Sequence, residues 1–317
     1  MSQGPAAPGT EDNTDANPTR REPTETPTAP PVDGADFVVV ANRLPVDVTV
    51  TDGEISWTRS PGGLVTALAP VMREADGAWV GWAGTPDVEL DDFEADDTHL
   101  VPVTLSAQEV EDYYEGFSNG TLWPLLHDAV VDPEFHRTWW NSYVSVNRRF
   151  ATRAAAIAAP GATVWVQDYQ LLLVPAILRS LRPDLRIGFF LHIPFPPPEI
   201  FSQLPWRRQI IDGLLGADLV GTQRSSDAAN ILRSVRRLTD WTTRGHVVTI
   251  GSRWTRPERH VRISAFPISI DTKAIAELAA TPEIIERAAQ IRRDLGDPDV
   301  MLLGVDRLDY TKGIRHR

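Results

Sequence analysis

Short β-rich runs alternate with helix-like stretches over most of this chain, and this alternation constrains the fold more than any other feature. Residues 37–41 read Phe-Val-Val-Val-Ala, which is typical of a buried strand. Similar runs occupy 78–82, 99–104, 163–167, 186–191, 218–222, 246–250 and 261–266. Helical spacing occurs at 64–72, where Pro70 should cause a kink, and at 139–158, 171–181, 204–216 and 225–238. Strands that alternate with helices predict an α/β fold, with a mostly parallel sheet covered by helices on both faces.

Composition divides the chain into three parts. Residues 1–35 hold seven prolines and almost no apolar side chains, so we expect a disordered tail. Residues 36–268 carry the alternating pattern and are predicted to form one domain. The segment from 269 begins with a linker, continues as a charged helix at 281–295, and reaches an apolar run at 300–305 that reads as a new buried strand. A second domain is therefore expected to begin in 269–317.

The overall composition excludes several classes of protein. The 317 residues include no cysteine, which excludes disulfides and cysteine-ligated metals and is typical of a cytoplasmic protein. No apolar run approaches the ~20 residues of a membrane span, and the N-terminus has no signal-peptide core. A net charge of −12 argues against nucleic-acid binding. An anionic substrate would need a local basic pocket.

One such pocket is indicated after the first strand. Arg43 follows the strand at 37–41, and the polar segment from there to residues 60–63 is predicted to be a loop. Gly62-Gly63 at its end precede the helical stretch that starts near residue 64. A planar guanidinium binds phosphate well, and a helix N-terminus preceded by glycines lets a phosphate approach the backbone. The alternative is that Gly62 and Gly63 form an ordinary turn.

Two further strands end in groups that can bind hydroxyls. Asp168 follows the strand at 163–167, and His192 follows the strand at 186–191, just before a proline-rich loop. Ligands of open α/β sheets bind beyond the carboxyl ends of the strands, so a carboxylate and an imidazole would face one crevice there. The alternative is a structural histidine with an aspartate that caps the next helix.

Two other segments carry chemistry. Residues 113–124 are aromatic-rich and are predicted to be a loop whose rings could stack on a sugar, although aromatic residues more often belong to a core. Arg307 and Lys312 follow the apolar run at 300–305 and precede a glycine. Two cations in this position suit a diphosphate. Lysine is rare in this chain, with Lys273 as the other example.

Six motifs occur in order along the chain. They are Ala-Asn-Arg-Leu-Pro at 41–45, Pro-Gly-Gly-Leu at 61–64, Tyr-Tyr-Glu-Gly-Phe-Ser-Asn-Gly-Thr-Leu-Trp-Pro at 113–124, Asp-Tyr-Gln-Leu at 168–171, Gly-Phe-Phe-Leu-His-Ile-Pro-Phe-Pro-Pro-Pro-Glu-Ile-Phe at 188–201 and Arg-Leu-Asp-Tyr-Thr-Lys-Gly at 307–313. Together they resemble the trehalose-6-phosphate synthase family. This resemblance implies a retaining glucosyltransferase of the GT-B type, with a Rossmann-like acceptor domain facing a Rossmann-like donor domain.

The resemblance also implies site roles on the acceptor side. Arg43 and Tyr114 would hold the phosphate of glucose 6-phosphate. Trp82 and Trp123 would line that pocket, and Asp168 would bind hydroxyls of the acceptor glucose.

On the donor side, the resemblance implies an ADP-, UDP- or GDP-glucose. Gly62 and Gly63 would lie close to this donor, and His192 would contact the transferring glucose. Arg307 and Lys312 would grip the diphosphate, so no metal and no cofactor would be needed. The four residues expected to take part in catalysis are His192, Asp168, Arg307 and Lys312. The product would be α,α-trehalose 6-phosphate.

Two departures from the family pattern qualify this reading. Gln167 stands where many relatives carry histidine, which affects a contact behind the site. The donor half of the family continues well beyond the length of this chain, so we expect a C-terminally truncated enzyme without measurable activity of its own, and a homo-oligomer only at full length. The alternative is a non-catalytic glucose-6-phosphate-binding module. A phosphorylase-type enzyme would need a cofactor-bearing lysine, which neither Lys273 nor Lys312 suits.

Overall fold

A computed structural model describes residues 34–51, 54–60, 65, 68, 71–72, 74–75, 77–96, 98–252 and 256–316. Gly62 and Gly63 lie outside the described residues, as does nearly all of the predicted N-terminal tail. Of the helical stretch predicted at 64–72, the described residues Val65, Leu68, Val71 and Met72 are helical.

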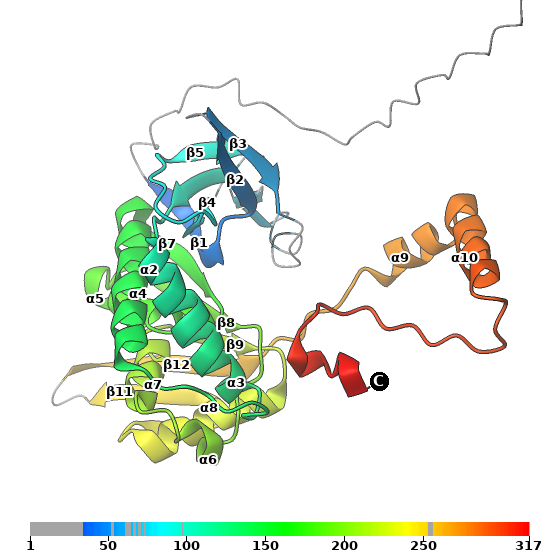
Figure 1. Ribbon diagram of the computed structural model, residues 1–317. Coiled ribbons are helices and arrows are strands. Elements are labelled where there is room, and N and C mark those ends of the chain that lie inside the picture. Colours follow the sequence, from blue (N-terminus) through cyan, green and yellow to red (C-terminus); the bar gives the residue numbers. More distant parts are fainter. Residues whose placement is uncertain are drawn as a thin grey trace, which may run out of the picture.

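One large sheet organises the chain (Figure 1). Its ten strands lie in the order β10 (Thr242–Arg244), β11 (Val247–Ser252), β12 (Arg256–Ala265), β9 (Leu219–Thr222), β8 (Arg186–Leu191), β7 (Ala158–Gln167), β1 (Ala35–Arg43), β4 (Ala78–Trp82), β6 (Thr98–Pro102) and β5 (Phe93–Ala95). All pairings from β12 to β6 are parallel. The edges at β10–β12 and β5 are antiparallel. The predicted α/β fold with a mostly parallel sheet is therefore confirmed.

Alternate side chains of the central strands enter two separate cores, because successive residues of a strand point to opposite faces. Val38, Val40 and Val166 belong to the larger core. Val39 and Trp79 belong to a smaller core on the other face, where they pack with the helical residues Leu68 and Met72 and with the hairpin described below.

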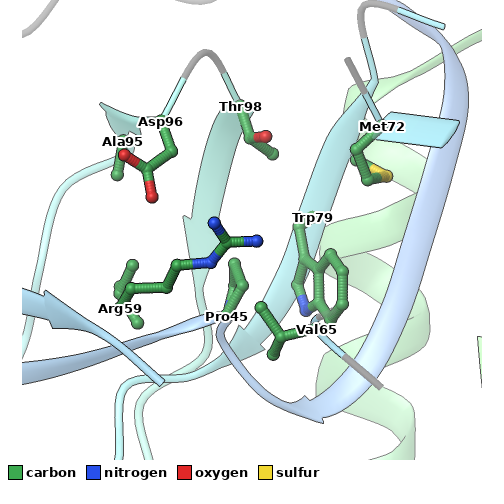
Figure 2. A pocket seen from close by; sticks show the side chains of 9 residues that line it. Pro45, Arg59, Val65, Met72, Trp79, Ala95, Asp96 and Thr98 are labelled. Atoms are coloured by element: carbon green, nitrogen blue, oxygen red, sulfur yellow. The ribbon is translucent and has the colours of Figure 1, made fainter. Parts of the chain in front are cut away.

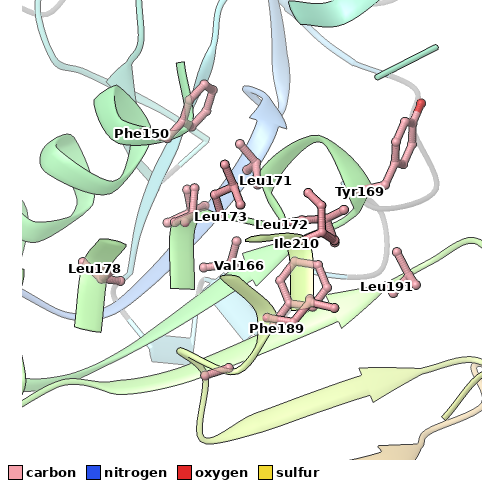
Figure 3. Close-up of a cluster of buried hydrophobic side chains, with 14 of the residues drawn as sticks. Phe150, Val166, Tyr169, Leu171, Leu172, Leu173, Leu178, Phe189, Leu191 and Ile210 are labelled. Atoms are coloured by element: carbon pink, nitrogen blue, oxygen red, sulfur yellow. The ribbon is translucent and has the colours of Figure 1, made fainter. Parts of the chain in front are cut away.

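The larger core is covered by four main helices, each with an apolar face. These are α4 (Arg137–Ile157), α5 (Val174–Leu181), α7 (Arg207–Leu214) and α8 (Ser225–Leu238). Figure 3 shows part of this core, in which Phe150 of α4 and Ile210 of α7 are buried in the same cluster as Val166 and Phe189 of the sheet. Short turns of helix complete this layer at α2 (Ala107–Glu109), α3 (Trp123–Leu126), α6 (Pro198–Phe201) and the 3-10 helix η2 (Tyr169–Leu171).

A β-hairpin occupies the segment after β1 that the sequence predicted to be a loop. Its strands are β2 (Val46–Thr51) and β3 (Glu54–Arg59), paired antiparallel. Val46 and Val48 are buried against the smaller core, which gives this polar segment an apolar side. The expectation of an irregular loop is therefore wrong.

The aromatic segment is also helical, and the prediction of a loop over 113–124 is wrong. Residues Val110–Leu122 form η1, a helix with π-type hydrogen bonding, which continues into α3. Tyr113 and Phe117 are fully buried on its inner side. The ring of Trp139 in α4 lies against Gly116, where a Cβ atom would come within 2.6 Å of the ring. The burial of this face makes the segment a helix despite two glycines.

The segment after the sheet agrees with its prediction in part, because the charged helix predicted at 281–295 is present as α10 (Pro282–Asp294). The segment also contains α9 (Thr272–Ala279) and the 3-10 helices η3 (Tyr310–Lys312) and η4 (Ile314–His316). Residues 300–305 were expected to form a buried strand, but they are exposed and unpaired with any described strand. An apolar run becomes a strand only beside another strand, since its backbone groups need partners. Among the described helices, none combines the length and apolar character that a membrane span requires.

Candidate active site

The candidate site lies at the carboxyl ends of β1, β4, β7 and β8, where the sequence predicted it. Arg43 is the last residue of β1, and its guanidinium carbon lies 5.1 Å from the centre of the Trp82 ring at the end of β4. Its Nη2 donates to Asp47 Oδ1 at 2.8 Å, and its side chain remains 43% exposed. A cation stacked on an aromatic ring and still open to solvent can receive a phosphate.

Gly84 leaves room for the side chain of Arg43, although the sequence analysis did not single out this glycine. Its φ angle is +95°, and a Cβ atom there would lie 2.1 Å from Arg43 Nη2. The guanidinium therefore occupies the space that any side chain at position 84 would fill. The turn Ala83-Gly84-Thr85-Pro86 directly after a strand was the sequence signal that could have revealed it.

The helix η1 brings aromatic groups to the same edge. Tyr114 lies with its ring centre 6.2 Å from that of Trp82, in a tilted arrangement. The neighbouring Tyr113 is buried and donates its hydroxyl to Asn42 Oδ1 at 2.8 Å, which fixes η1 to the end of β1. Tyr113 and Asn42 are positioning groups that sequence reasoning did not assign.

The other end of η1 meets the turn after β7. Tyr169 donates its hydroxyl to Asn119 Oδ1 at 2.9 Å, and its ring centre lies 5.5 Å from that of Trp123. Trp123 also contacts the His127 ring in a tilted arrangement, with 4.2 Å between ring centres. Trp123 and Tyr114 thus approach the strand ends from opposite ends of one helix.

Asp168 lies directly after β7 in a strained backbone conformation. Its φ angle is +69°, which is unusual for a residue with a side chain. Its Oδ1 accepts hydrogen bonds from the backbone N–H groups of Tyr169 at 3.0 Å and His192 at 3.2 Å. Burial raises the pKa of Asp168 to about 6, although these two bonds and the charge of Arg307 act in the opposite direction.

His192 follows β8 and lies beside Asp168, so the structure brings the two predicted residues together. Its Nε2 is 2.9 Å from Gln167 Oε1, and its ring centre is 4.7 Å from that of Phe190. Burial lowers the pKa of His192 to about 4, so the ring is neutral at physiological pH. A neutral imidazole and a carboxylate can bind several sugar hydroxyls.

The proline-rich loop after His192 is held by α8. The backbone N–H of Phe195 donates to Asp227 Oδ1 at 3.3 Å, and the backbone carbonyl of Phe195 accepts from Asn230 Nδ2 at 2.8 Å. Both polar side chains are buried. The side chains of α8 thereby satisfy backbone groups of a loop that cannot continue the sheet. His192, at the start of this loop, is held in place.

The C-terminal segment returns to this edge of the sheet. The guanidinium carbon of Arg307 lies 5.8 Å from the centre of the Trp123 ring, and Arg307 also pairs with Asp309 at 3.9 Å. Lys312 lies in η3. Burial lowers the pKa of His127, and the charge of Lys312 acts in the same direction, whereas the charge of Asp309 opposes it.

A hollow lies beside His192. It measures about 410 Å³, and its walls include Trp165, Gln167, Phe190 and His192. A smaller hollow of about 50 Å³ lies between the hairpin and the helical residue Met72, and Figure 2 shows Arg59 and Asp96 among the side chains that line it. The predicted site residues that the structure describes do not line this smaller hollow.

Comparison with known families identifies the chain's relatives. Residues 35–317 match the model of glycosyltransferase family 20. The chain belongs to this family. A trehalose-6-phosphate synthase of Mycobacterium sp. (strain KMS) is 58% identical to the family 20 chain over 287 residues. This match covers 89% of the chain and 59% of that relative, so the chain spans about 59% of the relative's length.

Solved structures extend the comparison to the fold. A trehalose-6-phosphate synthase, OtsA, matches 88% of the family 20 chain with 33% identity and a TM-score of 0.73, and 59% of OtsA is covered. An E. coli structure bound with UDP-2-fluoro glucose matches 82% with 32% identity and a TM-score of 0.68, and 54% of it is covered.

A UDP-forming α,α-trehalose-phosphate synthase from Burkholderia xenovorans, in complex with glucose-6-phosphate, is a further match. The match covers 82% of this chain and 55% of the Burkholderia xenovorans chain, with 27% identity and a TM-score of 0.67. The resemblance predicted from six motifs is thereby confirmed, as is the GT-B-type, Rossmann-like α/β fold.

Proposed function

We propose that this chain forms the acceptor-binding part of a retaining glucosyltransferase, which transfers glucose from a nucleotide-glucose to glucose 6-phosphate and yields α,α-trehalose 6-phosphate. One observation carries this proposal. A solvent-accessible guanidinium, Arg43, is stacked on Trp82 at the carboxyl edge of the sheet, where Asp168 and His192 also lie. A phosphate site and a hydroxyl site at one edge suit a sugar phosphate.

The acceptor would bind between β1, β4 and η1. Arg43 and Tyr114 would hold the phosphate, since a guanidinium and a phenol can both donate to its oxygens. Trp82 and Trp123 would form the walls of the pocket, and Asp168 would accept from the sugar hydroxyls. The glucose-6-phosphate complex of the Burkholderia xenovorans relative supports an acceptor of this class.

The donor would approach from the side of His192 and the C-terminal segment. His192 would contact the transferring glucose, and Arg307 and Lys312 would stabilise the negative charge of the leaving diphosphate. Gly62 and Gly63 would let the donor approach the backbone. The E. coli relative bound with UDP-2-fluoro glucose supports a nucleotide-glucose donor.

The chemistry would be a displacement on one face of the sugar. The bond between the glucose C1 and the diphosphate oxygen breaks, and the acceptor's anomeric oxygen forms its bond to C1 on the same side. The proton of the acceptor hydroxyl passes to the leaving phosphate. Catalysis would then rest on positioning and charge stabilisation, which the cations and hydroxyl-binding groups of this site can supply.

Calorimetric titration of the chain with a panel of small ligands tests this function. We expect saturable binding of glucose 6-phosphate, and binding at least about tenfold weaker for glucose and for inorganic phosphate, because each engages only one of the two subsites. Glucose 1-phosphate carries the same groups with the phosphate on the other side of the ring, so it serves as the matched control. Equal affinity for both sugar phosphates would contradict the proposal.

A further inference from the structure

Gln167 is a buried polar residue that the proposed mechanism does not use. It is the last residue of β7, directly before Asp168, and it is 1% exposed. Its Oε1 lies 2.9 Å from His192 Nε2. Its Nε2 is buried and has no hydrogen-bond partner among the described residues. A buried amide donor left unsatisfied destabilises a protein, so such a group calls for an explanation.

The hydrogen bond between the two side chains determines the state of the imidazole. The amide oxygen of Gln167 can only accept, so His192 must donate from Nε2. In a neutral ring one nitrogen carries the proton and the other carries the lone pair. His192 Nδ1 is then an acceptor and can receive a hydrogen bond from a hydroxyl.

The surroundings favour a ligand as the missing partner of the amide. Gln167 and His192 both line the hollow of about 410 Å³, together with the aromatic side chains of Trp165 and Phe190. Gly188 widens this hollow, since a Cβ atom there would touch the Trp165 ring at 3.3 Å. Apolar walls with a few buried polar groups are typical of a small-molecule site.

We infer that Gln167 is a positioning residue that holds His192 as the neutral, Nε2-protonated tautomer, and that its free amide N–H donates to a neutral sugar hydroxyl. This inference rests on the proposed contact between His192 and the transferring glucose. The inference gives the sugar one hydrogen-bond donor, the Gln167 amide, and one acceptor, His192 Nδ1. An amide does not titrate, so the pair keeps this polarity across the physiological pH range.

The tautomer can be measured without any ligand or activity. The chain has seven histidines, and long-range ¹H–¹⁵N spectra of the histidine-labelled protein report the protonation of each ring nitrogen. The His192 signals are assigned by their loss in His192→Asn. We expect a protonated Nε2 and an unprotonated Nδ1 that stay unchanged from about pH 5.5 to 8. A His192 ring protonated at Nδ1 instead would overturn the inference.

Two substitutions of Gln167 separate positioning from packing. Gln167→Met keeps the length of the side chain and removes the hydrogen bond, so we expect a mixture of His192 tautomers in a protein with an unchanged circular dichroism spectrum. Gln167→Glu keeps the acceptor and adds a charge, so His192 should stay protonated at Nε2 and should take up its second proton at a higher pH than in the wild type. A Met variant with the wild-type tautomer would show that Gln167 does not position the ring.

Addition of UDP-glucose then tests the ligand contact. The ¹⁵N-labelled side-chain amide of Gln167 should change its chemical shift on titration with UDP-glucose. The side-chain amide of Gln290 in α10 should keep its chemical shift, because it already donates to Asp294 Oδ1 in the same helix. A Gln167-dependent tautomer without this shift would support the positioning role and contradict the donor contact. A shift in the wild type that persists in His192→Asn would support the amide as a binding group on its own.

Discussion

At the scale of single residues, the site is built from side chains that backbone geometry holds in place. Asp168 has a φ angle of +69°, and its Oδ1 accepts from two backbone N–H groups. Gly84 leaves the space in which the Arg43 guanidinium lies. Strain of this kind persists only where the surrounding structure enforces it, and it is common at functional sites.

Gly84→Ala should weaken the binding of glucose 6-phosphate. The new methyl group would displace the Arg43 guanidinium, so we expect affinity to fall by at least about tenfold, or about 1.4 kcal/mol, in calorimetry. Gly161→Ala is the matched control, because Gly161 also has a positive φ angle of +73° but has open space around it. Equal loss of affinity in both variants would indicate general strain and would contradict the role of Gly84.

Asp168→Asn should change the pH dependence of both binding and stability. The raised pKa of Asp168, about 6, means that the carboxyl group stabilises the fold while it is protonated, and this contribution is lost as pH rises through 6. Asparagine keeps Oδ1, which makes both backbone bonds, and does not titrate. The variant should therefore gain stability relative to the wild type between about pH 4 and 7 in urea unfolding.

The affinity of the wild type for glucose 6-phosphate should rise with pH, whereas the contribution of Asp168 to stability falls. The ionised form of Asp168 is the stronger acceptor for hydroxyls, so the wild type should lose affinity for glucose 6-phosphate below about pH 6. The ligand's phosphate also titrates near this pH, with a second pKa of about 6. In Asp168→Asn, only this titration of the phosphate should change the affinity with pH. Identical pH profiles of affinity in the two proteins would show that Asp168 does not bind the acceptor.

At the scale of elements, the central strands and the main helices could be predicted because their patterns are local. The run at 186–191 became β8, and the stretch at 225–238 became α8, with the expected bounds. The hairpin β2–β3 could not be predicted, because its apolar side depends on contact with the smaller core. The prediction of a strand at 300–305 is wrong for the opposite reason. The pattern there is that of a strand, but no described strand pairs with it.

The helix η1 shows the same limit at the site itself. Its aromatic residues could be assigned to a sugar site, but its helical form depends on the contact of Gly116 with Trp139, which is distant in sequence. The candidate residues Arg43, Asp168 and His192 were predictable because parallel strands end at one edge. Gly84 was not, and for Gln167 the sequence indicated only a contact behind the site, since the partners of both residues depend on contacts made by the folded chain.

Gly116→Ala should destabilise the chain and disturb η1. A Cβ atom would come within 2.6 Å of the Trp139 ring, so we expect the free energy of unfolding to fall by about 1–3 kcal/mol in urea titrations. Gly120→Ala is the control, because its Cβ would meet the same ring at 3.2 Å and alanine also favours a helix. A Gly116→Ala protein as stable as Gly120→Ala would rule out this packing as the basis of η1.

At the scale of the whole molecule, the sheet gathers a few cations and hydroxyl-binding groups at one edge of an acidic chain. The net charge is −12, yet Arg43 and Arg307 stack on tryptophans at this edge. Overall charge therefore does not predict the ligand, whereas the arrangement of strand ends does. The helices from 272 onward bury none of their residues, and a change of domain near 269 stays a prediction.

The affinity of the chain for glucose 6-phosphate, compared between two arginine variants, tests the central claim most directly. Arg43→Ala removes a cation at the carboxyl edge of the sheet, and Arg186→Ala removes one from the first residue of β8, at the opposite edge. We predict that Arg43→Ala lowers the affinity by about tenfold or more, whereas Arg186→Ala leaves it unchanged within about twofold. Equal affinities in the two variants would contradict the assignment of the acceptor site.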